Sequence, residues 1–241
     1  MGSLHRGHVS LIEKSVLENN FTICSIYVNP TQFNERKDFS TYPRNMQLDI
    51  KILKSEHCDL LFSPTDKEMY PENSPLVKYD FTHFLKILEG EKRPGHFIGV
   101  ITIIHKLFSL IQPDRVYFGE KDYQQLWIIK LFTKTYALPI EIKSCETIRE
   151  KNGLALSSRN KNLDFSQKEK AAILFQSLQK FKKELEQANN IQEFQLSALK
   201  QKMIAIITDS LLIKLEYLEL IDDENFSFVR KIENNKNYRI L

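Results

Sequence analysis

Glycine, proline and histidine are confined to the first two thirds of this 241-residue chain. The seven glycines end at Gly153, the eight prolines at Pro139 and the six histidines at His105. Because glycine and proline mark turns and interrupt helices, this distribution predicts a turn-rich first domain, residues 1–147, and a smaller helix-rich domain, residues 148–241. Compositional drift in a chain rich in Lys, Asn and Ile is the alternative explanation.

The composition is that of a globular protein, with 42% hydrophobic and 27% charged residues. The net charge of +3 provides no bulk field for nucleic acid. No apolar run approaches the roughly 18 residues of a membrane span, and the N-terminus lacks the apolar core of a signal peptide. The three cysteines, Cys24, Cys58 and Cys145, are odd in number and far apart, which indicates a reducing cytoplasm and disfavours disulfides or a zinc site.

Strands and helices alternate in the first domain. Apolar segments rich in β-branched residues predict strands at 21–28, 59–63, 115–118 and 140–145, and longer segments predict helices at 43–56, 97–112 and 123–136. Such alternation predicts an α/β fold, a doubly wound, Rossmann-like parallel sheet with helices on both faces. Ligands of such sheets bind beyond the carboxyl ends of the strands.

The second domain reads as a small α+β unit. A capping box, Ser166 to Glu169, predicts a helix that runs to about residue 187, and a second helix is expected at 192–207. The alternating segment 215–221 predicts a half-buried strand, and another strand is expected to begin at 237–241.

The opening segment, MGSLHRGH, places His5 and His8 three residues apart at the start of a predicted helix, and therefore on one face. Gly7 between them would let a ligand approach the backbone. A helix N-terminus suits phosphate through its unpaired N–H groups and partial positive charge, and imidazoles there can donate to a phosphate that gains charge. A surface metal pair or chance spacing is the alternative, although the helix supplies no third metal ligand.

Two further strand-to-helix turns carry polar side chains. Asn29 and Gln32 follow the first strand, and their amides can donate to a carboxylate or hydroxyl without adding charge. Residues 119–122 (GEKD) follow the strand at 115–118, and Lys121 there supplies a mobile positive charge. Gln125, one turn further along, can face the same cleft as Gln32. Plain turns with solvated charges are the alternative for both segments.

Two loops complete the set of candidates. Residues 155–159 (ALSSR) offer two hydroxyls and a guanidinium, which are good ligands for terminal phosphates. Residues 90–99 (GEKRPGHFIG), which include His96, form either a mobile loop beside the cleft or a plain connection.

Taken together, these segments resemble the pantoate–β-alanine ligase (pantothenate synthetase) family of the HxGH nucleotidylyltransferase-like group. The resemblance covers residues 1–165 densely and in family order, through MGSLHRGH, IYVNPTQF, DFSTYPR, DLLFSP with EMYP, LEGEKRPGHFIGV, QPDRVYFGEKDYQQL and TIREKNGLALSSRN, and more loosely LEYLELID. It implies a doubly wound sheet that binds ATP and pantoate, a small C-terminal lid domain and a homodimer.

The resemblance implies ATP-dependent condensation of (R)-pantoate with β-alanine through pantoyl adenylate, releasing AMP and diphosphate. Mg²⁺ would bind through the ATP phosphates, with no metal-binding side chains. His8 would be the proton donor, with His5 and Lys121 beside the phosphates. ATP would contact Met1, Gly2, Ser3, Leu4, His5, Arg6, Gly7, His8, Gly119, Glu120, Lys121, Asp122, Ile148, Leu156, Ser157, Ser158 and Arg159. Gln32 would bind pantoate and β-alanine, Gln125 would bind pantoate, and Asn29, next to Gln32, would be a further substrate-binding residue.

The sequence departs from the family pattern at both ends. Family members have a strand and a Pro-Thr pair before the MGxLH segment, and a final strand after the region of 237–241. We therefore expect both ends of the chain to be shortened, residues 1–4 to be loosely held, and the edge of the strand at 21–28 to be exposed. Another HxGH nucleotidylyltransferase, or an inactive shortened relative that binds ATP or a partner chain, are the alternative functions.

Overall fold

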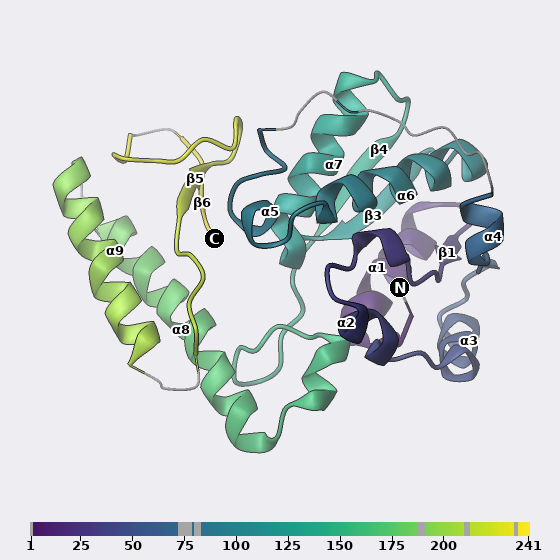
Figure 1. The fold of residues 1–241 in the computed structure, drawn as a ribbon, viewed down its shortest axis with the longest axis horizontal. Helices are drawn as coiled ribbons and strands as arrows, with labels where there is room; N and C mark the ends of the chain where they lie inside the picture. The colour runs from purple at the N-terminus through teal and green to yellow at the C-terminus, as the bar shows by residue number, and fades with distance from the viewer. Residues whose placement is uncertain (1, 72–78, 80–82, 188–190, 210–212, 234–235) are drawn as a thin grey trace. The chain divides into compact units, whose positions relative to one another are not determined.

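The computed structural model of the protein describes residues 2–71, 79, 83–187, 191–209, 213–233 and 236–241. The chain divides into two compact units (Figure 1). Unit 1 comprises residues 1–148 together with 156–159, and unit 2 comprises 149–155 together with 160–241. The chain therefore enters unit 2 at residues 149–155, returns to unit 1 at 156–159, and continues in unit 2 from residue 160.

Unit 1 alternates helices and parallel strands, as the sequence predicts. The strands β1, β2 and β4 are shorter than predicted, β3 is one residue longer, and the short helices α2, α4 and α5 were not predicted. In chain order the elements are α1 (Arg6–Glu18), β1 (Ile23–Ser25), the 3-10 turn η1 (Pro30–Gln32), α2 (Arg36–Thr41), α3 (Met46–Ser55), β2 (Leu60–Phe62), α4 (Asp66–Met69), α5 (Glu89–Lys92), α6 (His96–Ile111), β3 (Arg115–Gly119), the 3-10 turn η2 (Glu120–Asp122), α7 (Tyr123–Thr135) and β4 (Glu141–Cys145).

The strands form two parallel pairs rather than one continuous sheet among the described residues. β1 pairs with β2, with Ile23 opposite Leu60, and β3 pairs with β4, with Arg115 opposite Glu141. Each crossover carries a helix, α3 in the first pair and α7 in the second. The predicted parallel α/β architecture is thus confirmed, but the hydrogen-bonded ladder is interrupted between β1 and β3.

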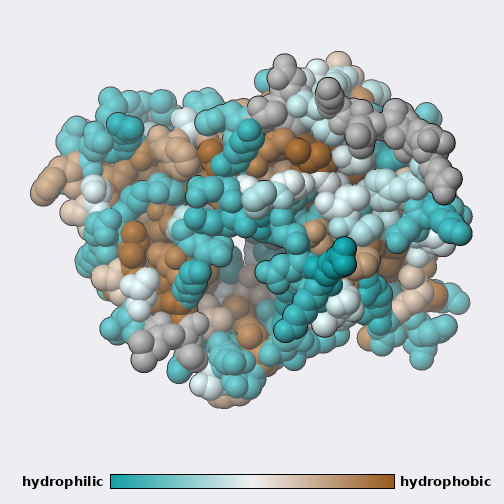
Figure 2. All heavy atoms as spheres, in the orientation of Figure 1, coloured by the Kyte–Doolittle hydropathy of each residue, from teal (hydrophilic) through white to brown (hydrophobic). Residues whose placement is uncertain are grey.

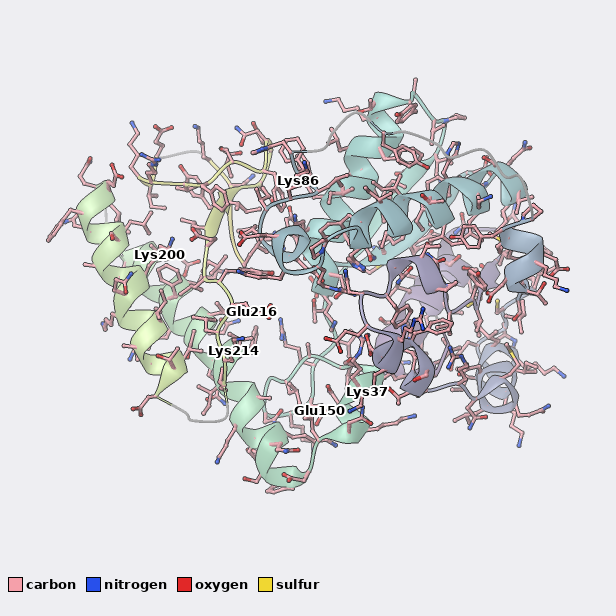
Figure 3. All side chains as sticks on the ribbon, in the orientation of Figure 1. Lys37, Lys86, Glu150, Lys200, Lys214 and Glu216 are labelled. Atoms are coloured by element: carbon pink, nitrogen blue, oxygen red, sulfur yellow. The ribbon has the colours of Figure 1, made fainter. Side chains whose placement is uncertain are left out.

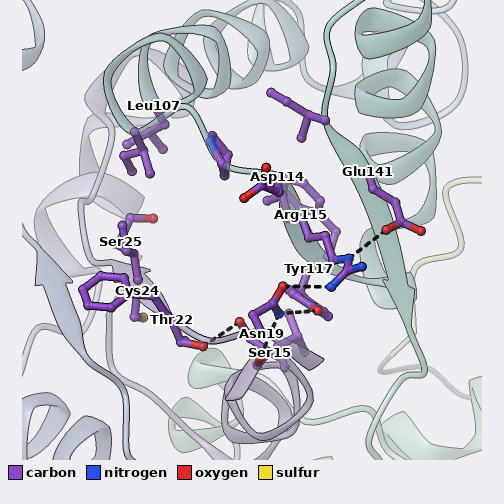
Figure 4. A pocket seen from close by; sticks show the side chains of 18 of the residues that line it. Ser15, Asn19, Thr22, Cys24, Ser25, Leu107, Asp114, Arg115, Tyr117 and Glu141 are labelled. Carbon is purple, nitrogen blue, oxygen red and sulfur yellow. Dashed lines mark hydrogen bonds and ion pairs between the residues drawn. The ribbon is translucent and has the colours of Figure 1, made fainter. Parts of the chain in front are cut away.

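A cavity of about 1160 Å³ lies where the ladder is interrupted. In Figure 4, Cys24 and Ser25 of β1 stand on one side of it and Arg115 and Tyr117 of β3 on the other. Asn19, the C-cap of α1, donates to the Tyr117 hydroxyl at 2.7 Å across its floor. Residues 21–25 line this cavity, and Phe21 and Ile23 are exposed whereas Thr22 is buried.

Two apolar clusters hold unit 1 together. The larger packs α6 and α7 against β3 and β4, and its fully buried side chains include Phe97, Ile101, Ile128 and Phe132. A smaller cluster packs α1 and α3 on β1, around Leu4, Ile12, Ile26 and Leu53. Since burial of one such side chain is worth about 1.5–3 kcal/mol, the α6–α7 cluster is the firmest support of the turns at the ends of β1 and β3.

Unit 2 has the small α+β organisation that the sequence predicts, but the strand predicted at 215–221 is wrong in extent, because only Leu220–Asp222 forms a ladder. It contains α8 (Phe165–Gln187), α9 (Glu193–Thr208) and the antiparallel pair β5 (Leu220–Asp222) and β6 (Tyr238–Ile240), closed over a core that includes Phe181 and Met203. The ammonium of Lys200, labelled on α9 in Figure 3, pairs with the Glu219 carboxylate at 2.6 Å.

The predicted cap of α8 is wrong in position. The reciprocal bonds form two residues earlier, between Asp164 and Gln167: each backbone N–H donates to the other side chain, at 2.8 and 2.9 Å. An Asp followed three residues later by Gln satisfies the same geometry as Ser and Glu. The helix therefore starts at Phe165, before the predicted box.

Apolar atoms reach the surface in several places (Figure 2). Phe165 and Phe194, at the starts of α8 and α9, are 80% and 82% exposed. None of the helices in the described part of the chain combines the length and apolar character needed to cross a membrane.

Candidate active site

The first turn of α1 is closed by its two histidines. His5 is the N-cap, and its Nδ1 accepts the backbone N–H of Gly7 at 3.1 Å. His8, three residues on, returns the bond: its Nδ1 accepts the backbone N–H of His5 at 3.3 Å. This is a capping box in which imidazoles occupy the positions usually held by Ser or Thr and Glu or Gln.

The cap fixes the tautomer of both rings. A ring nitrogen that accepts a hydrogen bond carries no proton, so in each neutral ring the proton lies on Nε2. The ring centroids lie 4.0 Å apart, and the pair therefore forms a compact group with two Nε2–H donors. This arrangement is typical of a site that binds an oxyanion.

The backbone donors expected at this helix terminus are already in use. Gly7 N–H bonds to His5 Nδ1, and the N–H groups of His8 and Val9 both donate to the His5 carbonyl, at 2.7 and 3.0 Å. The expectation that unpaired N–H groups of this turn bind phosphate is therefore corrected for these three residues. The imidazoles take the place of the backbone as donors.

His8 is held in its neutral form. Burial, with added repulsion from His5, from the N-terminus and from Lys121, lowers its pKa to about 3, against a smaller opposing effect of Asp122. The charges of Lys121 and Asp122 are therefore within electrostatic range of His8. At neutral pH the His8 ring is an uncharged donor.

The segment before α1 is anchored by Asp49 of α3, a residue that the sequence analysis missed. Its carboxylate accepts the backbone N–H groups of Ser3 and Leu4 at 2.8 and 2.7 Å. Gly2 has φ +89°, and an added Cβ there would lie 3.2 Å from that carboxylate. The expectation that residues 1–4 are loosely held is therefore wrong for Gly2, Ser3 and Leu4, whereas Met1 lies outside the described residues. The available signal was a carboxylate four residues before Leu53, on the buried face of the helix.

Gln32 stands at the end of η1 with its side-chain oxygen engaged. Asn29 donates from Nδ2 to Gln32 Oε1 and to the Gly99 carbonyl, both at 3.2 Å. The Oδ1 of Asn29 accepts from Thr31 and, at 2.7 Å, from the hydroxyl of Tyr70. Asn29 is only 1% exposed, so it holds Gln32 and is not itself placed to bind a substrate.

Residues 119–122 form the predicted turn between β3 and α7. The Lys121 ammonium lies 3.0 Å from the Asp122 carboxylate, and both side chains are exposed. Glu120 in the same turn is half-buried. A Cβ added at Gly119 would meet nothing within 4 Å, so the backbone there is open to a ligand.

The first turn of α7 carries two glutamines, Gln124 and Gln125, of which only Gln125 was predicted to bind substrate. Gln125 is half-buried, and among the described residues it makes no hydrogen bond to Gln32. Its neighbour Gln124, not singled out from the sequence, is buried: it donates to the carbonyls of Phe84 and Ile87 and accepts the N–H of Glu89. Gln124 thereby fixes the loop that leads into α5.

Two contacts, made by Leu156 and Ser158, hold the segment 156–159 against the rest of unit 1. Leu156 donates its N–H to the Ile148 carbonyl at 2.9 Å, and its Cβ lies 3.7 Å from the Cβ position that Gly7 leaves empty. The Ser158 hydroxyl lies 3.3 Å from that of Tyr42. Leu156 thus brings this segment against the histidine turn.

Arg159 is engaged by the helix α2. Its guanidinium contacts both oxygens of Asp38, at 2.9 and 3.3 Å, and lies over the Tyr42 ring at 5.4 Å. Its N–H donates to the Ser157 hydroxyl at 3.3 Å. Asp38 and Tyr42 were overlooked as site residues, although both belong to the matched segment DFSTYPR.

No group of three or more His, Cys, Asp or Glu side chains that could hold a metal ion occurs among the described residues. Of the candidate residues, Leu4 and His8 also line the cavity between β1 and β3. The candidate site itself is the set of turns around the start of α1.

Parallel β–α units and a helix capped by two imidazoles define an α/β protein with a candidate oxyanion-binding site. The family model for pantoate-beta-alanine ligase matches residues 1–241. The chain belongs to this family of carbon–nitrogen ligases.

Curated relatives and solved structures agree with this placement. The chain is 39% identical to the pantothenate synthetase of Caldicellulosiruptor bescii over 233 residues, 97% of this chain and 81% of the relative. It is 41% identical to that of Azobacteroides pseudotrichonymphae over 237 residues, 98% and 82% of the two chains. The crystal structure of pantothenate synthetase from Thermus thermophilus superposes with a TM-score of 0.90 at 35% identity, covering 99% of this chain and 84% of that one.

A further solved structure is the pantoate-beta-alanine ligase from Francisella tularensis, complexed with beta-gamma ATP and beta-alanine. It has a TM-score of 0.72 and 39% identity, and the match covers 100% of this chain and 85% of that one. These structures confirm the predicted Rossmann-like α/β fold.

Proposed function

We propose that this chain condenses (R)-pantoate with β-alanine, using ATP, to give pantothenate, AMP and diphosphate. One observation supports the proposal: in the histidine cap of α1 both Nδ1 atoms accept backbone N–H groups, which leaves Nε2–H as the donor, and Lys121 is within electrostatic range of His8. Family membership defines the ligase chemistry, and the Francisella relative is complexed with beta-gamma ATP and beta-alanine.

In the first step, a carboxylate oxygen of pantoate attacks the α-phosphorus of ATP. An oxygen–phosphorus bond forms, the bond to the β-phosphate breaks, and diphosphate leaves with the electron pair. The phosphate oxygens gain negative charge in the transition state, and donors aimed at that charge accelerate the step. His5, His8 and Lys121 are the groups proposed to donate.

The neutral state of His8 defines how it acts. A ring with a pKa of about 3 has no extra proton to transfer at neutral pH, and diphosphate leaves as an anion that requires none. We therefore assign His8 a hydrogen-bonding role in place of the proton-donor role that the family resemblance implied.

In the second step, the β-alanine amine attacks the carbonyl carbon of pantoyl adenylate. A carbon–nitrogen bond forms, the carbon–oxygen bond to the phosphate breaks, AMP leaves, and the amine loses its proton. The Gln32 oxygen accepts from Asn29, and its NH₂ group is of a type that can donate to the hydroxyl or carboxylate of pantoate and β-alanine. Water must be excluded because the mixed anhydride hydrolyses.

The remaining assignments follow the family resemblance. Residues 1–147 bind ATP and pantoate, with Gln125 on pantoate, and residues 148–241 form the small second domain. ATP contacts the turns at 1–8, 119–122, 148 and 156–159. Mg²⁺ accompanies ATP and is held mainly by phosphate oxygens and water, as is usual for this ion. A homodimer in the cytoplasm completes the proposal.

The test measures AMP, diphosphate and pantothenate with ATP, pantoate and β-alanine, each omitted in turn. The proposal requires that pantothenate needs all three, and that diphosphate without β-alanine forms at most stoichiometrically with enzyme. Turnover only with a different, phosphorylated acceptor would favour another nucleotidylyltransferase. ATP binding without any product would identify an inactive relative.

A further inference from the structure

We propose that His96 is a positioning residue, whose Nδ1–H holds the main chain of Gln32 and thereby sets where the Gln32 amide meets its substrates. The inference rests on the proposed function of Gln32. It gives a role to the 90–99 segment, which the sequence analysis left as either a mobile loop or a plain connection.

The geometry defines which ring nitrogen carries the proton. His96 Nδ1 lies 2.8 Å from the Gln32 carbonyl oxygen, an atom that can only accept. The ring must therefore donate through Nδ1–H. His5 and His8 have the opposite tautomer, since their Nδ1 atoms accept. The site thus holds three histidines with two different, structurally fixed protonation patterns.

The His96 ring is inside the protein, 4% exposed, on the first turn of α6. Burial lowers its pKa, which favours the neutral ring. Without this donor, the carbonyl of the half-buried Gln32 would lose its hydrogen bond to the interior ring.

The helix backbone also contacts the Gln32 turn directly. A Cβ on Gly99 would lie 2.4 Å from the Thr31 carbonyl oxygen and 2.8 Å from Gln32 N. Next to this contact, the Asn34 amide donates to the Pro94 carbonyl at 2.7 Å. The start of α6 is therefore a platform on which the turn rests without an intervening side chain.

Asn29 extends the same support to the Gln32 side chain, because one Nδ2 group bonds both Gly99 O and Gln32 Oε1. α6 consequently holds Gln32 at two atoms: at the main-chain oxygen through His96, and at the side-chain oxygen through Asn29. Loss of either hydrogen bond would let the Gln32 side-chain amide move away from the end of β1.

Two matched variants test the role. In His96→Asn, the side-chain amide nitrogen occupies the position of Nδ1 and can donate to the same carbonyl. In His96→Gln, the amide lies one bond further out. We expect His96→Asn to keep the KM for pantoate and β-alanine within about threefold of wild type, and His96→Gln to raise both by about tenfold, the effect of one lost hydrogen bond. The KM for ATP should not change in either variant.

A second measurement does not depend on activity. In protein labelled with ¹⁵N-histidine, the His96 signals are identified by their loss in His96→Asn, and their shifts report the tautomer. An Nδ1–H tautomer is expected. An Nε2–H tautomer in wild type, or an unchanged pantoate KM in folded His96→Gln, would overturn the proposal. If wild type makes no pantothenate, the function proposal fails, while the tautomer measurement still decides the contact.

Discussion

The Asp49 carboxylate accepts the backbone N–H of Leu4 at 2.7 Å, from a position 45 residues further along the chain. The second carboxylate oxygen takes the N–H of Ser3 at 2.8 Å. Helix α3 thereby determines where the chain enters α1, and with it the location of both imidazoles. Asp49 is 1% exposed, so water is not available to replace it.

Asp49→Asn should destabilise the protein and displace the entry to α1. Asparagine offers one oxygen and one NH₂ group, so one of the two N–H groups would face a donor. Leaving a buried group unsatisfied costs about 1–3 kcal/mol. Urea unfolding measures the loss, and ATP titration should show weaker binding. Asp209→Asn, the same change at the exposed end of α9, is the control; equal effects of the two variants would contradict this role.

His8→Ala should fold and lose most adenylate formation. Removal of one transition-state donor typically lowers the rate by about 10²–10³-fold. Single-turnover formation of pantoyl adenylate is the measurement, with His83→Ala, at an exposed position, as the matched control. A His8→Ala rate within threefold of wild type would remove His8 from the mechanism.

The depressed pKa of His8 also predicts a pH dependence of stability. The unfolded ring, with a pKa near 6.5, binds a proton that the folded ring, at about 3, does not. The free energy of unfolding should therefore fall as pH drops from about 6.5 towards 3, by at most about 1.4 kcal/mol per pH unit from this group. Urea unfolding between pH 8 and 4.5 should show a shallower decline in His8→Asn. Parallel curves for the two proteins would rule out this origin of the slope.

Lys121→Ala should slow the first step far more than the second. The ammonium is placed to meet charge that grows on the phosphates during adenylation, and amine attack does not add such charge. Supplying preformed pantoyl adenylate should largely restore pantothenate formation. Lys130→Ala, exposed on α7, serves as the control. Equal slowness with the intermediate would show that Lys121 does not act on adenylation.

Two glycines should respond in opposite ways to alanine. Gly99→Ala places a Cβ 2.4 Å from the Thr31 carbonyl and should lower the thermal midpoint and raise the KM for pantoate. Gly119→Ala meets open space at ordinary φ, so its midpoint should stay within about 2 °C. If ATP approaches that backbone, only its KM for ATP rises. A stable, fully active Gly99→Ala would contradict the close packing of α6 on the turn.

Local patterns predicted much of the architecture. The length of the apolar run at 97–112 favoured a buried helix over a strand, and α6 matches it within one residue at each end. The start of α1 with both histidines on its first turn was also predicted, because His5 and His8 are close in sequence. Parallel pairing followed from the β–α order. The interruption of the hydrogen-bonded ladder between β1 and β3 could not be predicted from hydrophobic periodicity. The sequence of one strand does not show which other strand it pairs with.

The site was predictable only where its members are close in sequence. Asp49, Tyr42 and Tyr70 act on residues 39 to 116 positions away, and no local pattern links such partners. The capped state of the first turn was also missed. The sequence suggested free backbone donors there, whereas imidazole nitrogens compete for them at hydrogen-bonding distance.

Because the two histidines cap α1, the orientation of their Nε2–H groups depends on the first turn of this helix staying closed. The bonds that close the first turn of α1 are the same bonds that keep both protons on Nε2. When this turn opens, as helix termini do at a small fraction of the global unfolding free energy, the rings recover both tautomers and lose their common direction. Warming should therefore reduce the active fraction before the core of α6 and α7 melts. The temperature at which activity declines would then measure the opening of the first turn of α1. Calorimetry of the whole chain would instead measure the unfolding of its core.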